Sequence, residues 1–428
     1  MFSVNAIGGR ARGPRLSSVL GSLLLALCAS ASALAEDSLN EQFIGALKGG
    51  DFDLSLRYRY EWVDSQAVAK EANASTLLTR LIYKSAEFKS IFLTLNMDDL
   101  RPIVADRFND TRNNKTQYPI VADPKGTDLN LASLTWTGLD NASLVLGRQR
   151  IIRANARFIG NVVWRQNEQT YDSISFAYSP IEKLDLFYAY IDRVKRVFGP
   201  NDGIPTSSFR SNSHLIDAAY TFGAPLKLTG YAYLLDFDNA AVLSSATYGL
   251  RATGSVPVGD SLKIGYVGEF AAQSDYGDNP VSYDANYYVV EGSLGWERFG
   301  FKLGLETLEG NGTLASSFRT PLATGFKFNG WADQFLVTPA NGLEDAYAEA
   351  NAKFLKGTWK LIYHDFSANT GGGDYGSEID FVASWKFGGA YSALIRAARY
   401  RSDAPNCVAQ VGGSCDTDKV WAQLSADF

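Results

Sequence analysis

The chain has few of the features that announce common protein classes. After residue 35 no segment approaches the roughly 20 apolar residues that a membrane-spanning helix needs. Basic residues are not in excess, because 40 lysines and arginines stand against 46 acidic residues, which argues against nucleic-acid binding. No glycine-rich phosphate loop, zinc spacing or calcium-loop pattern appears. The sequence therefore predicts no cofactor and no metal site.

The first 35 residues read as a secretory signal. Three arginines precede an apolar stretch from Val19 to Leu27, and Ala33 to Ala35 fits an A-x-A cleavage site. Removing those arginines changes the balance from 40 minus 46 to 37 minus 46, or −9. A lipoprotein alternative would acylate Cys28, but Leu27 stands where a small residue is needed. We expect residues 1–35 to be removed and residues 36–50 to form a periplasmic N-terminal segment.

The last ten residues alternate apolar and mostly polar side chains. A strand with one lipid-facing and one lumen-facing side must alternate with period two, and about ten tilted residues cross a bilayer. The apolar phase ends on an aromatic carboxy-terminus, the feature that bacterial barrels present to their assembly machinery. This phase comprises Val420, Ala422, Leu424, Ala426 and Phe428.

The same alternation recurs along the chain and predicts an all-β fold. With the last strand we count about eighteen segments, an even number normal for bacterial transmembrane antiparallel β-barrels; a soluble periplasmic β-protein is the alternative. We expect the barrel to span residues 51–428. The other segments are 51–62, 75–84, 90–97, 129–136, 142–148, 171–178, 184–192, 214–222, 226–234, 246–256, 262–270, 288–296, 301–307, 343–354, 358–366, 378–387 and 391–400.

The connections between these segments alternate strictly between short and long. The short ones are rich in Gly, Pro, Asn or Asp, as in Ser179-Pro180-Ile181-Glu182, and aromatic residues gather beside them. The long ones include 99–127, 151–169, 194–213 and 309–342. Barrels of this kind have short periplasmic turns and long extracellular loops. We therefore expect both termini to be periplasmic.

Two cysteines remain after the signal, and both precede the last strand. In an oxidising envelope compartment we expect Cys407 and Cys415 to form a disulfide. A metal or redox site is the alternative, but it has no histidine nearby in sequence.

An arginine-rich stretch stands out from the mixed charges of the predicted lumen. A barrel of this width must be filled by water or by loops that fold inward. If the 151–169 loop folds inward, its guanidinium groups would hold carboxylates and its aromatics would stack on sugar rings; a salt-bridge network that pins the loop through Glu168 and Asp172 is the alternative. The candidate channel-lining residues are Arg148, Gln149, Arg150, Arg153, Arg157, Trp164 and Arg165, with Arg57 and Arg59 on the inward phase of the first strand.

Four motifs resemble the alginate-export family of outer-membrane porins. The resemblance implies an eighteen-stranded barrel with an arginine-rich conduit for an anionic polysaccharide. The chain departs from the exporter in its uniformly short periplasmic turns. The motifs are Gly147-Arg148-Gln149-Arg150-Ile151, Trp164 to Asp172, Gly330 to Phe335, and Tyr363-His364-Asp365-Phe366.

The sequence favours a passive channel in the outer membrane of a Gram-negative bacterium. Its partners would be membrane lipid, the barrel-assembly machinery and small hydrophilic solutes, anionic or sugar-like. Export of a polysaccharide such as alginate is the second hypothesis. An outer-membrane enzyme is the third, with His214 or His364 in a dyad, but neither histidine has an obvious nucleophile partner in sequence.

The cysteine pairing gives a first prediction. We expect the mature protein to resist alkylation until it is reduced, and then to gain two adducts by mass spectrometry. A loop this short adds only about 2 kcal/mol to stability, so a Cys407→Ser, Cys415→Ser double variant should assemble normally. Alkylation of the native, unreduced protein would contradict the pairing.

Overall fold

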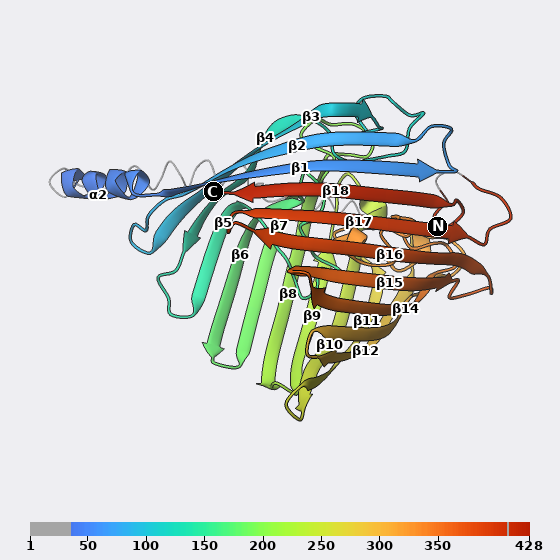
Figure 1. Ribbon diagram of the computed structural model, residues 1–428. Helices are drawn as coiled ribbons and strands as arrows, with labels where there is room; N and C mark the ends of the chain where they lie inside the picture. Colours follow the sequence, from blue (N-terminus) through green and yellow to red (C-terminus); the bar gives the residue numbers. More distant parts are fainter. Residues whose placement is uncertain (1–35, 409–410) are drawn as a thin grey trace, which may run out of the picture.

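The backbone closes into one antiparallel barrel. The computed structural model describes residues 36–408 and 411–428. The strands found there are β1 (Asp51–Ser65), β2 (Ala72–Lys84), β3 (Ile91–Arg107), β4 (Gly126–Trp136), β5 (Ala142–Gln149), β6 (Thr170–Ile181), β7 (Leu184–Lys195), β8 (Ser208–Gly223), β9 (Leu226–Leu235), β10 (Ser245–Val258), β11 (Leu262–Asp275), β12 (Asp284–Trp296), β13 (Phe299–Leu308), β14 (Leu343–Phe354), β15 (Gly357–Ser367), β16 (Asp374–Phe387), β17 (Tyr391–Ser402) and β18 (Thr417–Asp427). Each strand pairs with its neighbours in sequence, and β1 also pairs with β18 (Figure 1). The all-β barrel with eighteen strands in the described residues is confirmed.

The N-terminal segment contains a helix, α2 (Glu36–Lys48), which projects from the end of the barrel where the chain terminates (Figure 1). It is anchored by Phe43, whose ring lies 5.8 Å from that of Phe88. Three short 3-10 turns, Ala241–Leu243, Leu314–Ser316 and Gly325–Lys327, lie in the connections between strands. In the residues described, no helix has the length and apolar character to cross a membrane. The predicted signal, residues 1–35, lies outside the described residues.

The two faces of the wall differ as the alternation requires. On β13 the outward residues Phe301 and Leu303 are 52% and 68% exposed, whereas the inward residue Glu306 is buried. Exposed apolar side chains recur at the outward positions of β10 to β12, among them Leu250, Ile264 and Val290. An apolar belt around a polar interior is the arrangement that suits a strand wall surrounded by lipid.

The two ends of the barrel differ in their connections. One end has short turns, such as 182–183 and 297–298, and the other has long loops, such as 150–169 and 309–342. Every predicted segment overlaps an observed strand, although β3 continues to Arg107 and β8 begins earlier, at Ser208. Aromatic side chains pack together beside the short turns, for example Phe354 with Trp359 at 4.8 Å.

The loop between β17 and β18 contains the disulfide. Cys407 and Cys415 are bonded, with their Cα atoms 4.6 Å apart.

The carboxy-terminal residue completes the seam between the first and last strands. The amide of Phe428 donates to the carbonyl oxygen of Leu54 at 2.9 Å, and the amide of Leu54 donates to the carbonyl oxygen of Phe428 at 3.0 Å. The ring of Phe428 contacts Tyr391 at a centroid distance of 6.0 Å. Since β1 and β18 pair although they are the first and last strands described and are not consecutive in the chain, these bonds fix the register at which the barrel closes.

Deletion of Phe428 should therefore reduce assembly. The deletion removes two backbone hydrogen bonds at the seam and an aromatic side chain on the lipid phase. We expect less of the fast-migrating, unheated form in detergent gels, whereas a Phe299→Ala control at a short turn away from the seam should keep it. Equal amounts of assembled protein in both variants would show that closure does not depend on this residue.

Candidate functional site

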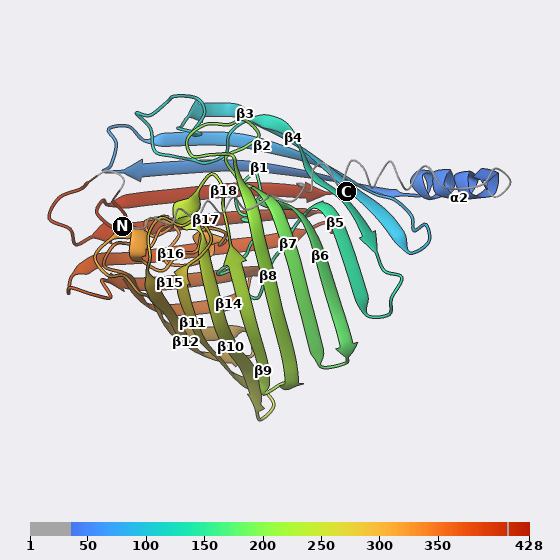
Figure 2. The same ribbon diagram turned by 180° about the vertical axis from the view of Figure 1, so that it is seen from behind.

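Two long connections fold into the barrel and fill the half nearest the long loops. The amide of Gly160 in the β5–β6 loop (150–169) donates to the carbonyl oxygen of Leu322 in the β13–β14 loop (309–342) at 2.9 Å. Phe158 packs against Tyr287 of β12, and Trp164 packs against Trp421 of β18. The β5–β6 loop thus contacts distant parts of the wall. Figure 2 shows the orange β13–β14 loop coiled within the end opposite α2.

Arg57 and Arg165 attach the β5–β6 loop to β1. Arg57 donates to the side-chain oxygen of Gln166 at 2.7 Å and to the carbonyl oxygen of Arg165 at 2.8 Å. Arg165 in turn lies 3.2 Å from Glu61 and 3.8 Å from Asp123. Burial alone would lower the pKa of Arg165, but these two carboxylates outweigh it and raise the pKa. Both arginines are therefore engaged by the protein.

Glu168 attaches the same loop to the strands β2 and β4, through Arg80 and Asn130. Its carboxylate accepts from Arg150 at 2.5 and 2.7 Å and from Asn130 at 2.5 Å, and it lies 2.8 Å from Arg80. Burial works to raise the pKa of Glu168, but the hydrogen bond from Arg150 and the charge of Arg80 lower it overall. Four polar groups, with Asn161 at 3.1 Å, thus meet on one carboxylate.

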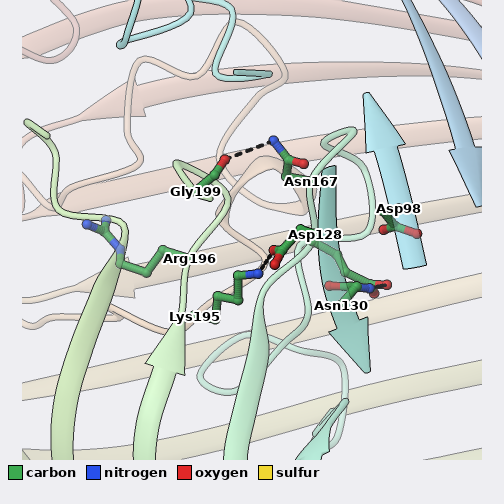
Figure 3. A pocket seen from close by; sticks show the side chains of 8 residues that line it. Asp98, Asp128, Asn130, Asn167, Lys195, Arg196 and Gly199 are labelled. Atoms are coloured by element: carbon green, nitrogen blue, oxygen red, sulfur yellow. Dashed lines mark hydrogen bonds and ion pairs between the residues drawn. The ribbon is translucent and has the colours of Figure 1, made fainter. Parts of the chain in front are cut away.

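A small polar cavity adjoins Glu168. Figure 3 shows Asp98, Asn130 and Asn167 around it, with the ion pair of Lys195 and Asp128 on its other side. Its volume of about 10 Å³ has room for roughly one water molecule. The cavity is therefore part of the packing of the loop and not a solute site.

Arg153 and Arg157 hold the tip of the β5–β6 loop. Arg153 forms an ion pair with Asp217 of β8, with one contact at 2.6 Å, and its guanidinium lies 3.8 Å from the ring centre of Phe187. Arg157 is buried, pairs with Glu306 of β13 at 2.9 Å and donates to Asn329 at 2.9 Å. The salt-bridge network that the sequence left as an alternative is present, with more partners than Glu168 and Asp172.

Arg148 lies on the outer face of the wall and so does not line the lumen. It shares a face of β5 with Leu144 and Leu146, and these three residues lie opposite Asp172, Phe176 and Ile174 of β6. It pairs there with Asp172 at 2.6 Å. Gln149 is the inward residue at this position, where it accepts from Ser175 at 2.8 Å. The prediction that Arg148 lines the lumen is therefore wrong. Arg148 continues the outward phase of Leu144 and Leu146 to the end of β5.

Trp164 lies at the centre of a stack of cations and aromatic rings. Its ring lies parallel to that of Phe326 at 4.6 Å. The guanidinium of Arg59 is 4.1 Å from the ring centre of Trp164, and that of Arg396 is 4.0 Å from it and also 4.0 Å from Trp331. Such contacts stabilise a cation by about 0.5 to 2 kcal/mol. They leave the N–H groups of the guanidinium at the edge of the ring available for hydrogen bonds.

Arg59 and Arg396 differ from the loop arginines in their hydrogen bonding. Within residues 36–408 and 411–428 neither forms an ion pair with a carboxylate. Arg59 donates to the side-chain oxygen of Gln423 through Nη2 at 2.7 Å and through Nε at 3.2 Å, but its Nη1 has no acceptor. Nε and Nη1 of Arg396 also have no acceptor. Because a buried N–H group without a partner is costly, an acceptor that reached these donors would be stabilised by them.

Sequence reasoning found Arg59 and Trp164 but not their partners. Arg396 lies on the inward phase of β17, although nothing in its local sequence distinguishes it from other inward charges. Trp421 lies on the inward phase of the last strand among polar residues, and this exception to the pattern was a usable signal. Phe326 and Trp331 belong to a loop whose path no periodicity describes.

Known protein structures match the fold over most of the chain. A structure of Acinetobacter baumannii OccAB2 aligns with a TM-score of 0.69 at 16% identity, covering 90% of this chain and 98% of that one. Pseudomonas aeruginosa OpdK with vanillate gives 0.68 at 14%, covering 90% and 100%, and Pseudomonas aeruginosa OccK9 (OpdG) gives 0.69 at 15%, covering 90% and 99%. No family model matches the sequence, and no curated protein matches it. The comparisons show the fold.

The resemblance to the alginate-export family is corrected by these findings. The fold neighbours are Occ and Opd proteins. Of the motifs that suggested the exporter, one contributes a loop–wall contact, Asp333 with Lys419 of β18 at 2.6 Å, and another a contact within the wall, His364 of β15 with Asp345 of β14 at 2.8 Å.

Replacement of Glu168 should loosen the β5–β6 loop. A Glu168→Gln variant keeps the size of the side chain but leaves Arg80 and Arg150 short of a partner. Breaking a buried ion pair in this way costs about 3 to 5 kcal/mol. We expect faster trypsin cleavage at the loop arginines and a lower free energy of unfolding, compared with a Glu182→Gln control in an exposed turn.

Acid should have the same effect on the native protein. The pKa of Glu168 is lower in the folded protein than in the unfolded chain, so its contribution to stability is complete at neutral pH and is lost as the pH falls through the lowered pKa.

Cleavage rates that are equal in Glu168→Gln, Glu182→Gln and wild-type protein would show that the loop is held by other contacts.

Proposed function

We propose that this protein is a passive outer-membrane channel for small hydrophilic solutes that favours small carboxylates. The observation that carries the proposal is the pair Arg59 and Arg396, whose N–H donors lack acceptors beside the Trp164 stack. A carboxylate accepts two parallel hydrogen bonds from a guanidinium. An entering carboxylate would therefore find donors that the protein itself leaves unused.

The surrounding charges support selection by these two residues. The loop arginines Arg150, Arg153, Arg157 and Arg165 are each neutralised by an acidic partner. In a narrow region of low dielectric constant, the nearest unneutralised charges act more strongly than the distant net charge. Arg59 and Arg396 would thus dominate the local potential despite the acidic balance of the whole chain.

The aromatic rings favour planar solutes. Trp164, Phe326 and Trp331 form a largely buried stack with the two guanidinium groups. A planar solute would pack beside these rings while the guanidinium groups hold its carboxylate. The structure of OpdK, one of the fold neighbours, is described with vanillate, which is a small aromatic carboxylate. We accordingly place aromatic monocarboxylates ahead of sugars among the solutes of this channel.

The proposal does not include catalysis. His364 is buried and bonded to Asp345, and His214 lies on the outer side of β8, hydrogen-bonded to Tyr188 at 3.0 Å. Neither contact is with a serine, threonine or cysteine.

The same proposal places the short turns and both termini in the periplasm, and the long loops outside the cell.

Removal of the two central charges should reduce anion selectivity. In an Arg59→Gln, Arg396→Gln variant, the reversal potential of a planar bilayer in a KCl gradient should move toward cations, most strongly at low ionic strength. Hydrogen bonds to a charged group contribute about 1.5 to 3 kcal/mol. The benzoate concentration that half-blocks the current should therefore rise roughly tenfold or more.

The matched control is Arg148→Gln, which removes the same charge from the outer face. It should leave both the reversal potential and the block by benzoate unchanged. If the double variant folds, as judged by its heat-modifiable migration, and still behaves like wild type, then the two arginines are structural and the channel does not select carboxylates through them.

A further inference from the structure

A second set of cations lines a cavity at the short-turn end of the barrel. The cavity has a volume of about 730 Å³ and is bordered by β9 to β14 and by the turns between them. None of its lining residues belongs to the β5–β6 loop or to the stack at Trp164. It therefore lies apart from the site described above.

Lysines project into this end of the lumen from alternate strands. Lys227 is on β9, Lys263 on β11 and Lys302 on β13. In register, Lys263 lies opposite Gly295 and Lys302 lies opposite Ser293, both on β12. Since neighbouring strands are about 4.8 Å apart and these positions are offset by two residues along β12, the backbones of Lys263 and Lys302 are separated by roughly 12 Å.

The wall between these lysines consists of very small side chains. Gly265, Ser293, Gly295 and Gly300 form it. At Gly265 a Cβ atom would approach the Oγ of Ser293 to 2.6 Å, so a larger residue does not fit without movement. The result is a polar notch with ammonium groups on both sides; the aromatic residues that border the cavity, Tyr266, Phe299 and Phe301, lie on the outward phase of β11 and β13.

The acidic groups of the cavity do not neutralise all of its cations. Glu291 lies 3.4 Å from Lys302, Glu349 lies 2.8 Å from Lys360, and Asp185 lies 3.6 Å from Lys227. Glu297 is the remaining acidic lining residue. In the part of the chain that the structure describes, Lys263, Arg298 and Lys353 have no ion pair. Five basic residues thus line the cavity against three acidic ones, which leaves a positive excess.

We infer that this cavity is a second solute subsite, which binds small hydrated anions carrying two negative charges. The inference deepens the proposed channel function and rests on it. Lysine is a compact, strongly hydrated charge on a flexible stem. Several such groups around a notch walled by glycine and serine suit a hydrated dianion such as phosphate, whereas the planar arginines and rings at Trp164 suit an aromatic monocarboxylate.

Inorganic phosphate is a direct probe of this subsite. In a planar bilayer with dilute KCl on both sides, added phosphate should reduce the chloride current of the wild-type protein. Removing two exposed charges weakens binding by about 1 kcal/mol in total. In a Lys263→Gln, Lys302→Gln variant the half-blocking phosphate concentration should therefore rise roughly fivefold.

Two further variants isolate the subsite. Lys183→Gln removes a lysine from an exposed turn at the same end that does not line the cavity, and it should block like wild type. Arg59→Gln, Arg396→Gln should lose block by benzoate but keep block by phosphate, so failure of the lysine subsite is distinguishable from failure of the carboxylate site. Equal phosphate block in wild type and in a heat-modifiable Lys263→Gln, Lys302→Gln variant would overturn the inference.

Discussion

Buried ion pairs between an inward loop and the barrel wall are the interaction on which the rest of this structure depends. A barrel of this circumference encloses more space than its own side chains fill. The β5–β6 loop enters that space, where its arginines meet Glu61, Asp217 and Glu306 of the wall and its own Glu168 meets Arg80 of β2. Desolvating such charges costs nearly as much as their attraction returns. Their main effect is therefore to fix the position of the loop.

The position of the loop decides which cations remain available to a solute. Arg165 and Arg157 form ion pairs with Glu61 and Glu306 that hold the loop, and Arg57 donates to the loop backbone. The loop in turn brings Trp164 between Arg59 of β1 and Arg396 of β17. An aromatic ring stabilises these guanidinium groups through its face without occupying their N–H donors. The carboxylate site that we propose thus consists of the arginines that contact the loop but do not pair with an acidic residue.

The sequence predicted the wall far better than the contents of the lumen. Period two and turn composition depend on the strand alone, so segments such as 51–62 and 262–270 fall within β1 and β11. The roles of the arginines depend on partners that are distant in sequence, such as Arg157 with Glu306, and no local pattern encodes them. Arg148 was misplaced although its phase was readable, because Leu144 and Leu146 precede it on the same face.

The two cation sets in the lumen differ in chemistry as well as in place. At Trp164 rigid arginines lie against largely buried aromatic rings, where a bound solute would lose much of its water. At the short turns flexible lysines border a wide cavity with glycine and serine in its wall, where a bound solute would keep its water. In our proposal, a monocarboxylate that had passed the first set would be held only loosely by the second, because a single charge would meet hydrated ammonium groups that salt screens. Conduction requires sites that bind strongly enough to admit a solute and weakly enough to release it, and the proposed pair of a strong and a weak site would meet that requirement.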